Sequence, residues 1–394
     1  MKKDATLFWP LMKDTISYSD RLKMSYFILS SSRFTNGPKV VEFEKKWSEW
    51  LGVKHSLFVS SGSTANFLLI AAIKDLYNLQ HGDKVLLPAC TWVTSVAPII
   101  QLGLTPIFCD ISLSNYCIDE SDLELIKEQH PDIKLVFTTH LLGFHSNIDQ
   151  IQKTFPDAIV AEDCCESHGV LNQDNQRTSQ SSQAMTFSFY YGHHMTTVEG
   201  GMVSTNNSEL YELMRMKRSH GFAREASNET FSYYKEKYDS ILPSFLFVTD
   251  GYNFRNTELS AVLGIAQLTR LDSFIRKRNI NYKKYLNIIS RYPDKFYIPE
   301  DYSGISSFSL PFMCKKPETV EVLKEQFSIH KIEYRPIVGG NLLNQPFLKG
   351  YSFCYDKTSY NVDLLQKCGL YIGNSQYLGV KEFEVLENIL LALE

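Results

Sequence analysis

The chain has 394 residues, 44% of them hydrophobic, which is enough for one large and one smaller domain with buried cores. Its formal net charge is only −4, and charges of both signs are interspersed, which argues against nucleic-acid and membrane-surface partners. We expect no signal peptide and no membrane helix, because apolar runs such as 67–73 fall far short of roughly 18 residues. Eight cysteines without CxxC spacing predict a reduced, cytoplasmic protein.

Short apolar runs alternate with helical patterns from residue 38 to about residue 204. This alternation is typical of βαβ units and predicts an α/β fold with a largely parallel sheet. Ligands of such sheets bind at the carboxyl ends of the strands. The predicted strands are 56–60, 84–87, 106–109, 135–138, 159–162, 184–189 and 202–205, and the predicted helices are 64–76, 93–102, 120–128, 148–155 and 208–218.

The remainder of the chain predicts an exposed insertion followed by a smaller α+β region. The polar stretch 223–238 is the insertion, and a long helical pattern covers 257–285. The smaller region has predicted strands at 307–312 and 332–335 and predicted helices at 320–327 and 382–392.

Polar segments follow several of the predicted strands. Ser60–Asn66 opens a helix with hydroxyl groups and backbone N–H groups, which suits a phosphate but also an ordinary helix N-cap. Trp92 follows the next strand, either as a stacking surface for a planar cofactor or as part of the core. Asp163 ends a third strand, where it could hold a pyridine nitrogen protonated or cap a helix.

The most informative segment is the loop 186–201, which contains two adjacent histidines. By themselves His193 and His194 are candidate bases, metal ligands or solvated loop residues. No carboxylate-rich ligand set accompanies them, so we expect no metal site.

Taken in order, these segments resemble the sugar aminotransferase family of fold-type I pyridoxal-phosphate enzymes. The family pattern is a phosphate loop, a stacking aromatic residue, an aspartate, and then Ser-Phe followed by a lysine and Glu-Gly-Gly. The resemblance spans nearly the whole chain and implies the aspartate-aminotransferase fold. It implies a large cofactor-binding domain with an N-terminal arm at 1–256 and a small C-terminal domain at 257–394.

The sequence departs from the family pattern at the residue that defines the aminotransferases. The family's lysine lies five residues after the serine and six before the glutamate, and both counts lead to His193. The segments 163–167, 189–194, 199–201 and 335–341 resemble those of the histidine-bearing sugar 3-dehydratases. Other histidine-bearing relatives carry a cysteine cluster for an iron–sulfur centre, whereas here the next cysteine after Gly201 is Cys314.

The resemblance assigns cofactor contacts residue by residue. Trp92 would stack on the ring of pyridoxal 5'-phosphate, Asp163 would bind the pyridine nitrogen, and Glu166 would lie near the ring hydroxyl. Gly62, Ser63 and Ser188 would hold the phosphate.

Three further residues receive roles on the same basis. Asn253 would reach the phosphate in the other subunit, which implies a homodimer. His220 and Arg335 are candidates for binding L-glutamate or the sugar nucleotide, although His220 is equally open to a structural role.

The reaction implied is dehydration at carbon 3 of a nucleotide-linked 4-keto-6-deoxy sugar, with GDP-4-keto-6-deoxy-D-mannose as the expected substrate. Glutamate would convert the cofactor to its pyridoxamine form, and His193 would then take a proton from the cofactor's methylene carbon while the hydroxyl group leaves. Histidine suits this role because a neutral imidazole is available near pH 7. Hydrolysis would release ammonia and a dideoxysugar of the colitose type, for O-antigen or another surface polysaccharide.

Three alternatives stay open at this point. One is a sugar aminotransferase that uses another lysine, of which Lys217 is the nearest in sequence. The second is a dehydratase for another nucleotide or sugar. The third is a non-catalytic regulator that binds the cofactor, which would need an extension that the sequence does not contain.

Overall fold

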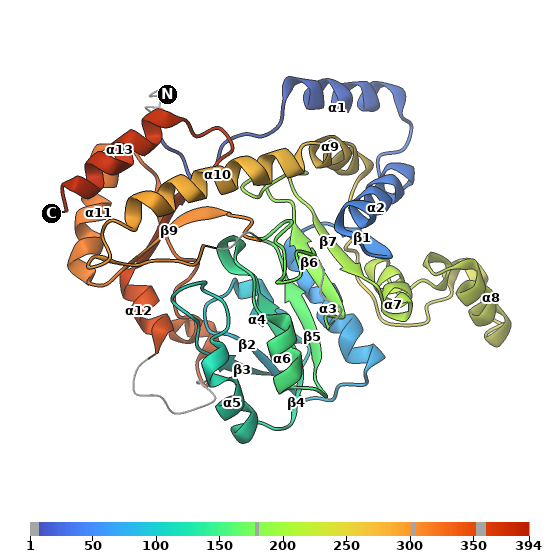
Figure 1. Cartoon of the computed structure of the whole chain (residues 1–394). Helices are drawn as coiled ribbons and strands as arrows, with labels where there is room; N and C mark the ends of the chain where they lie inside the picture. The colour runs from blue at the N-terminus through green and yellow to red at the C-terminus, as the bar shows by residue number, and fades with distance from the viewer. Residues whose placement is uncertain (1–7, 178–180, 302–303, 352–359, 394) are drawn as a thin grey trace.

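The computed structural model describes residues 8–177, 181–301, 304–351 and 360–393. A seven-stranded sheet lies at the centre, in the order β1-β7-β6-β5-β4-β2-β3, with helices around it (Figure 1). All pairs from β3 to β6 are parallel, whereas β7 is antiparallel to both β6 and β1. The strands are β1 His55–Val59, β2 Lys84–Pro88, β3 Thr105–Cys109, β4 Ile133–Thr139, β5 Ile159–Asp163, β6 Ala184–Ser188 and β7 Gly201–Thr205.

These strands are almost wholly buried, as expected for a parallel sheet covered on both faces. The prediction of an α/β fold with a largely parallel sheet is therefore confirmed. The helices that accompany the sheet are α3 Gly62–Leu76, α4 Val93–Gln101, α5 Leu123–Gln129, α6 Ile148–Thr154 and α7 Ser208–Arg218.

Two N-terminal helices were not predicted from the sequence. α1 spans Tyr18–Ser30 and buries only Asp20, so it has no apolar stripe from which a pattern could be recognised. α2 spans Pro38–Leu51 and packs against the sheet region through Phe43 and Trp47.

The prediction of a single helix over 257–285 is wrong, because the structure contains two helices. α9 spans Glu258–Leu268 and α10 spans Leu271–Ile289. The Thr269 hydroxyl donates to the carbonyl of Ala266 at 2.8 Å, and such a local side-chain bond competes with continuation of the helix.

A second, four-stranded antiparallel sheet follows, in the order β10-β11-β9-β8. Its strand β11 and the helix α12 were not predicted. The elements of this part are β8 Phe296–Tyr297, β9 Ser309–Cys314, α11 Pro317–Ile329, β10 Tyr334–Pro336, α12 Asn361–Cys368, β11 Gly369–Gly373 and α13 Val380–Leu391.

The N-terminal segment lies against this C-terminal sheet. The Trp9 indole N–H donates to the carbonyl of Gly373 at 2.7 Å, and the ring packs edge-on against Phe383. The chain therefore contacts the C-terminal part first and reaches the large sheet only after α1. The domain boundary between residues 256 and 257 stays a prediction.

The insertion predicted at 223–238 is an exposed segment that projects from the body (Figure 1). Its helix α8, Asn228–Lys237, contains no buried residue. In the part of the chain that the structure describes, no helix combines the length and apolar character needed to span a membrane.

Candidate active site

The turn between β1 and α3 forms a cradle at the N-terminus of a 15-residue helix. Ser61 and Thr64 form a capping box, in which the Thr64 N–H donates to Ser61 Oγ and the Ser61 N–H donates to Thr64 Oγ1. A Cβ atom on Gly62 would lie 2.6 Å from Cβ of Ser188, so only glycine lets the end of β6 approach this closely. The structure thus brings Gly62 and Ser188 together, with the exposed Ser63 beside them, and the helix N-terminus suits an anion.

Asp163 ends β5 and is only 2% exposed. Its Oδ2 accepts hydrogen bonds from Asn66 Nδ2 at 2.8 Å and Ser95 Oγ at 2.7 Å, and its Oδ1 accepts the Cys165 N–H at 3.0 Å. Thr186 Oγ1 in turn donates to Asn66 Oδ1 at 2.6 Å. A carboxylate held by three donors keeps its orientation and retains acceptor capacity on Oδ1, which fits a protonated ring nitrogen.

The residues that orient Asp163 were not identified from the sequence. Asn66 belongs to the loop singled out for phosphate binding, and Ser95 lies three residues after Trp92. That spacing, close to one helical turn, was the available signal for Ser95. No comparable signal pointed from Asn66 to Asp163.

Trp92 is the N-cap residue of α4 and is 57% exposed. The alternative that it belongs to the core is therefore wrong. Ser95 on the same helix contacts Asp163, so the exposed indole and the buried carboxylate lie at the same end of the sheet. This arrangement suits a planar ring between them.

Glu166 lies three residues beyond Asp163 and accepts the Leu142 N–H at 3.0 Å. Burial, with a contribution from the negative charge of Asp163, raises the pKa of Glu166 to about 7. Leu142 has a φ of +56°, an unusual backbone conformation for this residue type, and that conformation presents its N–H to Glu166.

Tyr371 is a residue of this region that the sequence did not reveal. It lies on β11 of the C-terminal sheet, paired with Arg335 of β10. Burial, together with the negative charge of Glu166, raises the pKa of the Tyr371 phenol. Arg335 is exposed and forms an ion pair with Glu333 at 3.2 Å, so its guanidinium remains accessible to a ligand.

The two adjacent histidines have different surroundings. His194 is fully buried, and its Nε2 contacts the Ser306 carbonyl at 3.1 Å and the Ser306 hydroxyl at 3.2 Å. His193 is partly exposed, and its buried Nδ1 has no hydrogen-bond partner among the residues that the structure describes. Burial, with the positive charge of Arg278 as the second cause, lowers the pKa of His193 to about 3. Both imidazoles are thus neutral at physiological pH, but only His193 has an open side.

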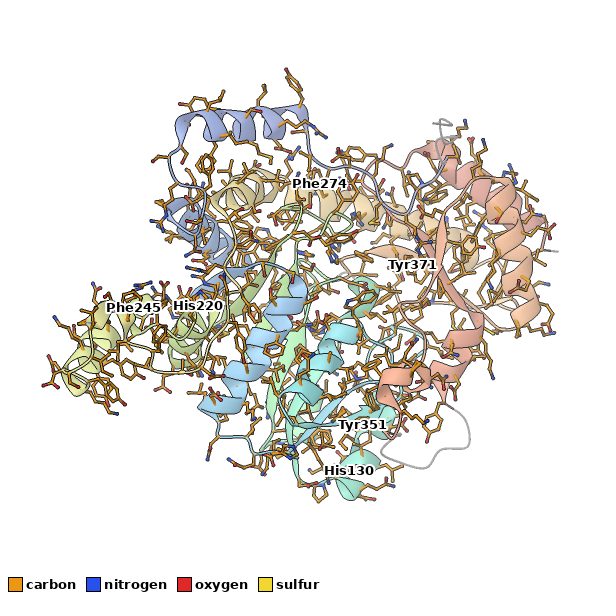
Figure 2. All side chains as sticks on the ribbon, turned by 180° about the vertical axis from the view of Figure 1, so that it is seen from behind. His130, His220, Phe245, Phe274, Tyr351 and Tyr371 are labelled. Carbon is orange, nitrogen blue, oxygen red and sulfur yellow. The ribbon has the colours of Figure 1, made fainter. Side chains whose placement is uncertain are left out.

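Asn253 and His220 lie together on the surface beside the phosphate cradle. Arg255 connects them, since its Nε donates to Asn253 Oδ1 at 3.1 Å and its terminal nitrogen contacts His220 Nε2 at 3.2 Å. The Ser60 N–H donates to the carbonyl of Phe254, which places this segment along the end of β1. Figure 2 shows His220 at the base of the projecting segment, near Phe245, with Tyr371 on the side of the C-terminal sheet.

Lys217 is not an alternative to the absent lysine. Its side chain is 1% exposed and forms ion pairs with Asp75 and Asp250. Although burial lowers the pKa of Lys217, the hydrogen bonds that its ammonium group donates to these two carboxylates outweigh burial and raise the pKa above its usual value. A protonated, paired ammonium group is not a nucleophile.

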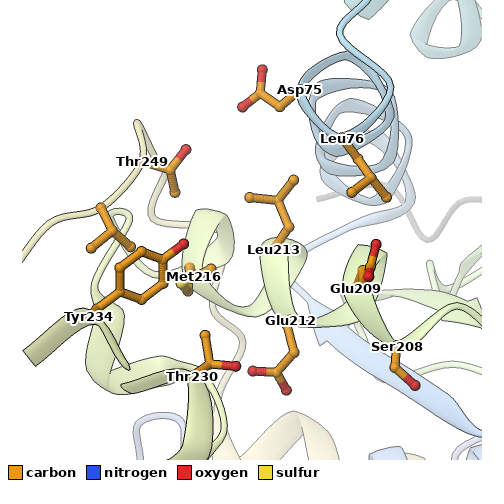
Figure 3. A pocket seen from close by; sticks show the side chains of 11 residues that line it. Asp75, Leu76, Ser208, Glu209, Glu212, Leu213, Met216, Thr230, Tyr234 and Thr249 are labelled. Carbon is orange, nitrogen blue, oxygen red and sulfur yellow. The ribbon is translucent and has the colours of Figure 1, made fainter. Parts of the chain in front are cut away.

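The acidic hollow beside Lys217 is separate from the predicted site. It has a volume of about 590 Å³ and lies between the end of α3, α7 and the α8 segment (Figure 3). Two of its acid groups already have partners in the chain, since Glu212 pairs with Arg215 and Asp75 pairs with Lys217. None of the residues predicted to form the site lines this hollow.

His140, Glu162 and Cys164 form a compact buried set whose side chains could ligate a metal ion. Hydrogen bonds within the chain explain why these side chains lie together without a metal ion. His140 Nδ1 accepts the Ser146 N–H at 2.9 Å, so Nε2 carries the proton and donates it to Glu162 at 2.7 Å. The imidazole therefore has no free lone pair for a metal ion.

The fold and the site define the class of protein. A mixed sheet of this strand order, with a glycine-opened helix facing Ser188 and a buried aspartate at the end of β5, is the pyridoxal-phosphate transferase fold of type I. The C-terminal α+β part completes it. The chain belongs to the DegT/DnrJ/EryC1/StrS aminotransferase family, whose model matches residues 18–355.

Individual relatives are similar over almost their full length. The chain is 35% identical to "GDP-4-keto-6-deoxy-D-mannose 3-dehydratase" of Escherichia coli O55:H7, over 92% of this chain and 94% of that one. Its structure is similar to the E. coli enzyme of that name with bound hydrated pyridoxal phosphate, with a TM-score of 0.86, 32% identity, and coverage of 98% of this chain and 100% of that one. A further structure of such a dehydratase contains a trapped pyridoxal-phosphate–glutamate geminal diamine. It gives a TM-score of 0.85 at 32% identity, with coverage of 97% of this chain and 100% of that one.

Proposed function

We propose that this protein is a 3-dehydratase of a nucleotide-linked 4-keto-6-deoxy sugar, with GDP-4-keto-6-deoxy-D-mannose as its substrate. L-Glutamate supplies the amino group that forms pyridoxamine phosphate, and ammonia is released after dehydration. The observation that carries the proposal is the half-open, neutral imidazole of His193 at the family's lysine position, with Lys217 held in ion pairs. The product is a dideoxysugar for a surface polysaccharide.

The chain's residues are arranged to bind and orient the cofactor. Gly62, Ser63 and Ser188 surround the N-terminus of α3, where backbone N–H groups and hydroxyls suit the phosphate. Asp163 accepts the hydrogen bond of the ring nitrogen, and the exposed Trp92 covers one ring face. When bound, pyridoxamine phosphate supplies the amine that condenses with the sugar's keto group and a ring that accepts electrons.

His193 moves the proton in this scheme. Because Nδ1 is buried, Nε2 is the nitrogen that we assign as the proton acceptor. A neutral imidazole needs no prior deprotonation at any pH between 5 and 8. The negative charges of the cofactor phosphate and of the diphosphate in the sugar nucleotide would raise the pKa of His193 towards the range in which a base works best. Histidine cannot form the covalent tether that a lysine forms, so release by hydrolysis follows.

The homodimer is part of the proposal. Asn253 and Arg255 are exposed beside the phosphate cradle, where their side chains are free to reach a second subunit. Exposed apolar side chains on α1 and shortly after α8, including Leu29 and Phe245, would be covered by a second copy. We place the reaction in the cytoplasm, because the eight cysteines of the chain lack CxxC spacing.

Product analysis tests the function directly. The protein with pyridoxal phosphate and L-glutamate is offered GDP-, CDP- and dTDP-linked 4-keto-6-deoxy sugars, and products are identified by NMR. We expect one 2-oxoglutarate and one ammonia for each 3-deoxysugar formed, with the GDP sugar as the fastest substrate. A 4-amino sugar would show an aminotransferase instead. Absence of 2-oxoglutarate would support the non-catalytic regulator.

A trapping experiment tests the loss of the covalent tether. Borohydride treatment of the protein with pyridoxal phosphate should leave no phosphopyridoxyl group on a lysine of the active site. The His193→Lys variant is the matched control, because a lysine at this position should give a stable reduced adduct. Mass spectrometry that finds an adduct on another active-site lysine of the native chain would contradict the assignment.

A further inference from the structure

Phe308 lies directly against the proposed base. The ring centroids of Phe308 and His193 are 5.5 Å apart, at an interplanar angle of 42°. On its other sides the His193 imidazole has His168 at 6.0 Å and Tyr190 at 6.2 Å between ring centroids. These rings limit the positions that the imidazole can adopt.

The backbone of Phe308 is held from both directions. Its N–H donates to the carbonyl of Leu142 at 3.0 Å, and Leu142 is the left-handed residue whose own N–H binds Glu166. Its carbonyl accepts a hydrogen bond from Arg278 at 2.9 Å. Phe308 thus connects the Glu166 side of the site with helix α10.

Arg278 is an unusual residue for this position. It is 5% exposed, and no carboxylate of the described residues lies within ion-pair distance of it. Its Nε finds no hydrogen-bond partner in that part of the chain, and its guanidinium makes the bond to the Phe308 carbonyl. Burying an unpaired guanidinium is costly, which indicates a role beyond stabilising the fold.

We propose that Arg278 and Phe308 are positioning residues, in which the buried guanidinium clamps the Phe308 carbonyl and thereby holds the Phe308 ring against the imidazole of His193. The inference rests on the proposed dehydratase function, in which the His193 imidazole must face the methylene carbon of the bound cofactor in one orientation. Misplacement of a catalytic group by about 1 Å costs on the order of 100-fold in rate.

The charge of Arg278 adds a second, measurable effect. It lowers the pKa of His193 after the larger effect of burial, and it also lowers the pKa of His194. The other titratable groups facing His193 are His168, Tyr190 and His194, of which His168 is likewise buried with a lowered pKa. Removing the positive charge should therefore raise the pKa of His193.

The test separates the ring contact from the charge. Phe308→Leu removes the ring, Arg278→Met removes both the clamp and the charge, and Arg278→Lys restores the charge. Arg276→Met is the control, because Arg276 is an exposed arginine on the same helix. Each variant is assayed for pyridoxal-phosphate affinity, single-turnover dehydration and the NMR titration of ¹³C-labelled histidine, with the His193 signal assigned by its loss in His193→Asn.

We expect Phe308→Leu and Arg278→Met to lower the dehydration rate about 10- to 100-fold with cofactor affinity unchanged. Arg278→Met should raise the titration midpoint of His193 by on the order of one pH unit, and Arg278→Lys should reverse that rise. The proposal is overturned if Phe308→Leu turns over like the native enzyme, or if the rates fall only in step with cofactor loss and melting temperature. If Arg278→Met does not fold, the dehydration rate of Phe308→Leu alone tests the positioning role. Failure of the native enzyme on every sugar would refute the function, whereas the NMR titration of Arg278→Met would still test the effect of the Arg278 charge on His193.

Discussion

The side chains around Asp163 and those around Asn253 differ in how the chain holds them. Asp163 is buried and receives three hydrogen bonds from Asn66, Ser95 and the backbone of Cys165. Asn253 is exposed, and its bond to Arg255 joins two surface side chains. The first group is held by buried hydrogen bonds, whereas the second is held by hydrogen bonds between exposed side chains. Changes in the two groups should therefore have different consequences.

The largest effect is expected at His193, which is partly exposed. His193→Asn should keep the loop shape and the cofactor yet lower dehydration about 100- to 10,000-fold, because an amide does not accept the proton at neutral pH. Single-turnover rates with the 4-keto sugar measure this loss. His194→Asn is the neighbouring control. Since His194 is buried against Ser306, the His194→Asn substitution should change the melting temperature more than the dehydration rate. Loss of dehydration only in His194→Asn would show that the base is His194.

Asp163→Asn should have the next largest effect. The substitution keeps the size of the side chain and removes the charge that binds a protonated ring nitrogen. A charged hydrogen bond contributes about 1.5–3 kcal/mol, so cofactor affinity should fall roughly 10- to 100-fold. Fluorescence titration with pyridoxamine phosphate measures the change. Unchanged affinity and rate would remove Asp163 from the cofactor site.

At the exposed group the effect should be smaller and should depend on the partner subunit. Asn253→Ala should weaken cofactor binding about 2- to 10-fold, the loss of one ordinary hydrogen bond, without lowering the melting temperature. Mixed dimers of Asn253→Ala and His193→Asn chains should regain native affinity in the site that keeps His193. If those dimers show the weakened affinity there, Asn253 acts within its own chain.

Asn256→Ala is the matched control for Asn253. Asn256 is buried and donates to the carbonyl groups of Val59 and Glu199. Its removal leaves buried carbonyls without partners and should lower the free energy of unfolding by about 1–3 kcal/mol. Chemical denaturation of both alanine variants would show whether the exposed and buried asparagines differ as expected.

A further effect concerns the pH dependence of stability at Glu166. Its pKa in the folded chain is about 7, above the ordinary value of 4.5, because burial disfavours the charged form. The protonated form is therefore stabilised, and this contribution is complete below pH 4.5 and is lost as the pH rises through 7. Glu166→Gln should match the native melting temperature near pH 5 and exceed it at pH 8. A constant difference across this range would contradict the raised pKa.

Local patterns predicted the elements that carry the site with little error. The strand predicted at 159–162 is β5, Ile159–Asp163, and the helix predicted at 208–218 is α7. Apolar runs bounded by polar loops are visible in any window of the chain, so these elements needed no tertiary information. Helix α1 was missed because it has almost no buried face and therefore no apolar pattern. The break at Thr269 was missed because it depends on the hydrogen bond of a single hydroxyl group.

By itself, the sequence determined the succession of strands and helices from β1 to β7, the residues at the strand ends, and the place of His193 between Ser188 and Glu199, because such spacings are short and covalent. Only the tertiary structure decided which side chains orient these residues. Asn66 and Ser95 reach Asp163 from 97 and 68 residues away, and Arg278 holds Phe308 across 30 residues. These contacts depend on strand order and on how the C-terminal part packs. The physical reason is that burial and hydrogen bonding act between neighbours in space, which a linear pattern does not specify.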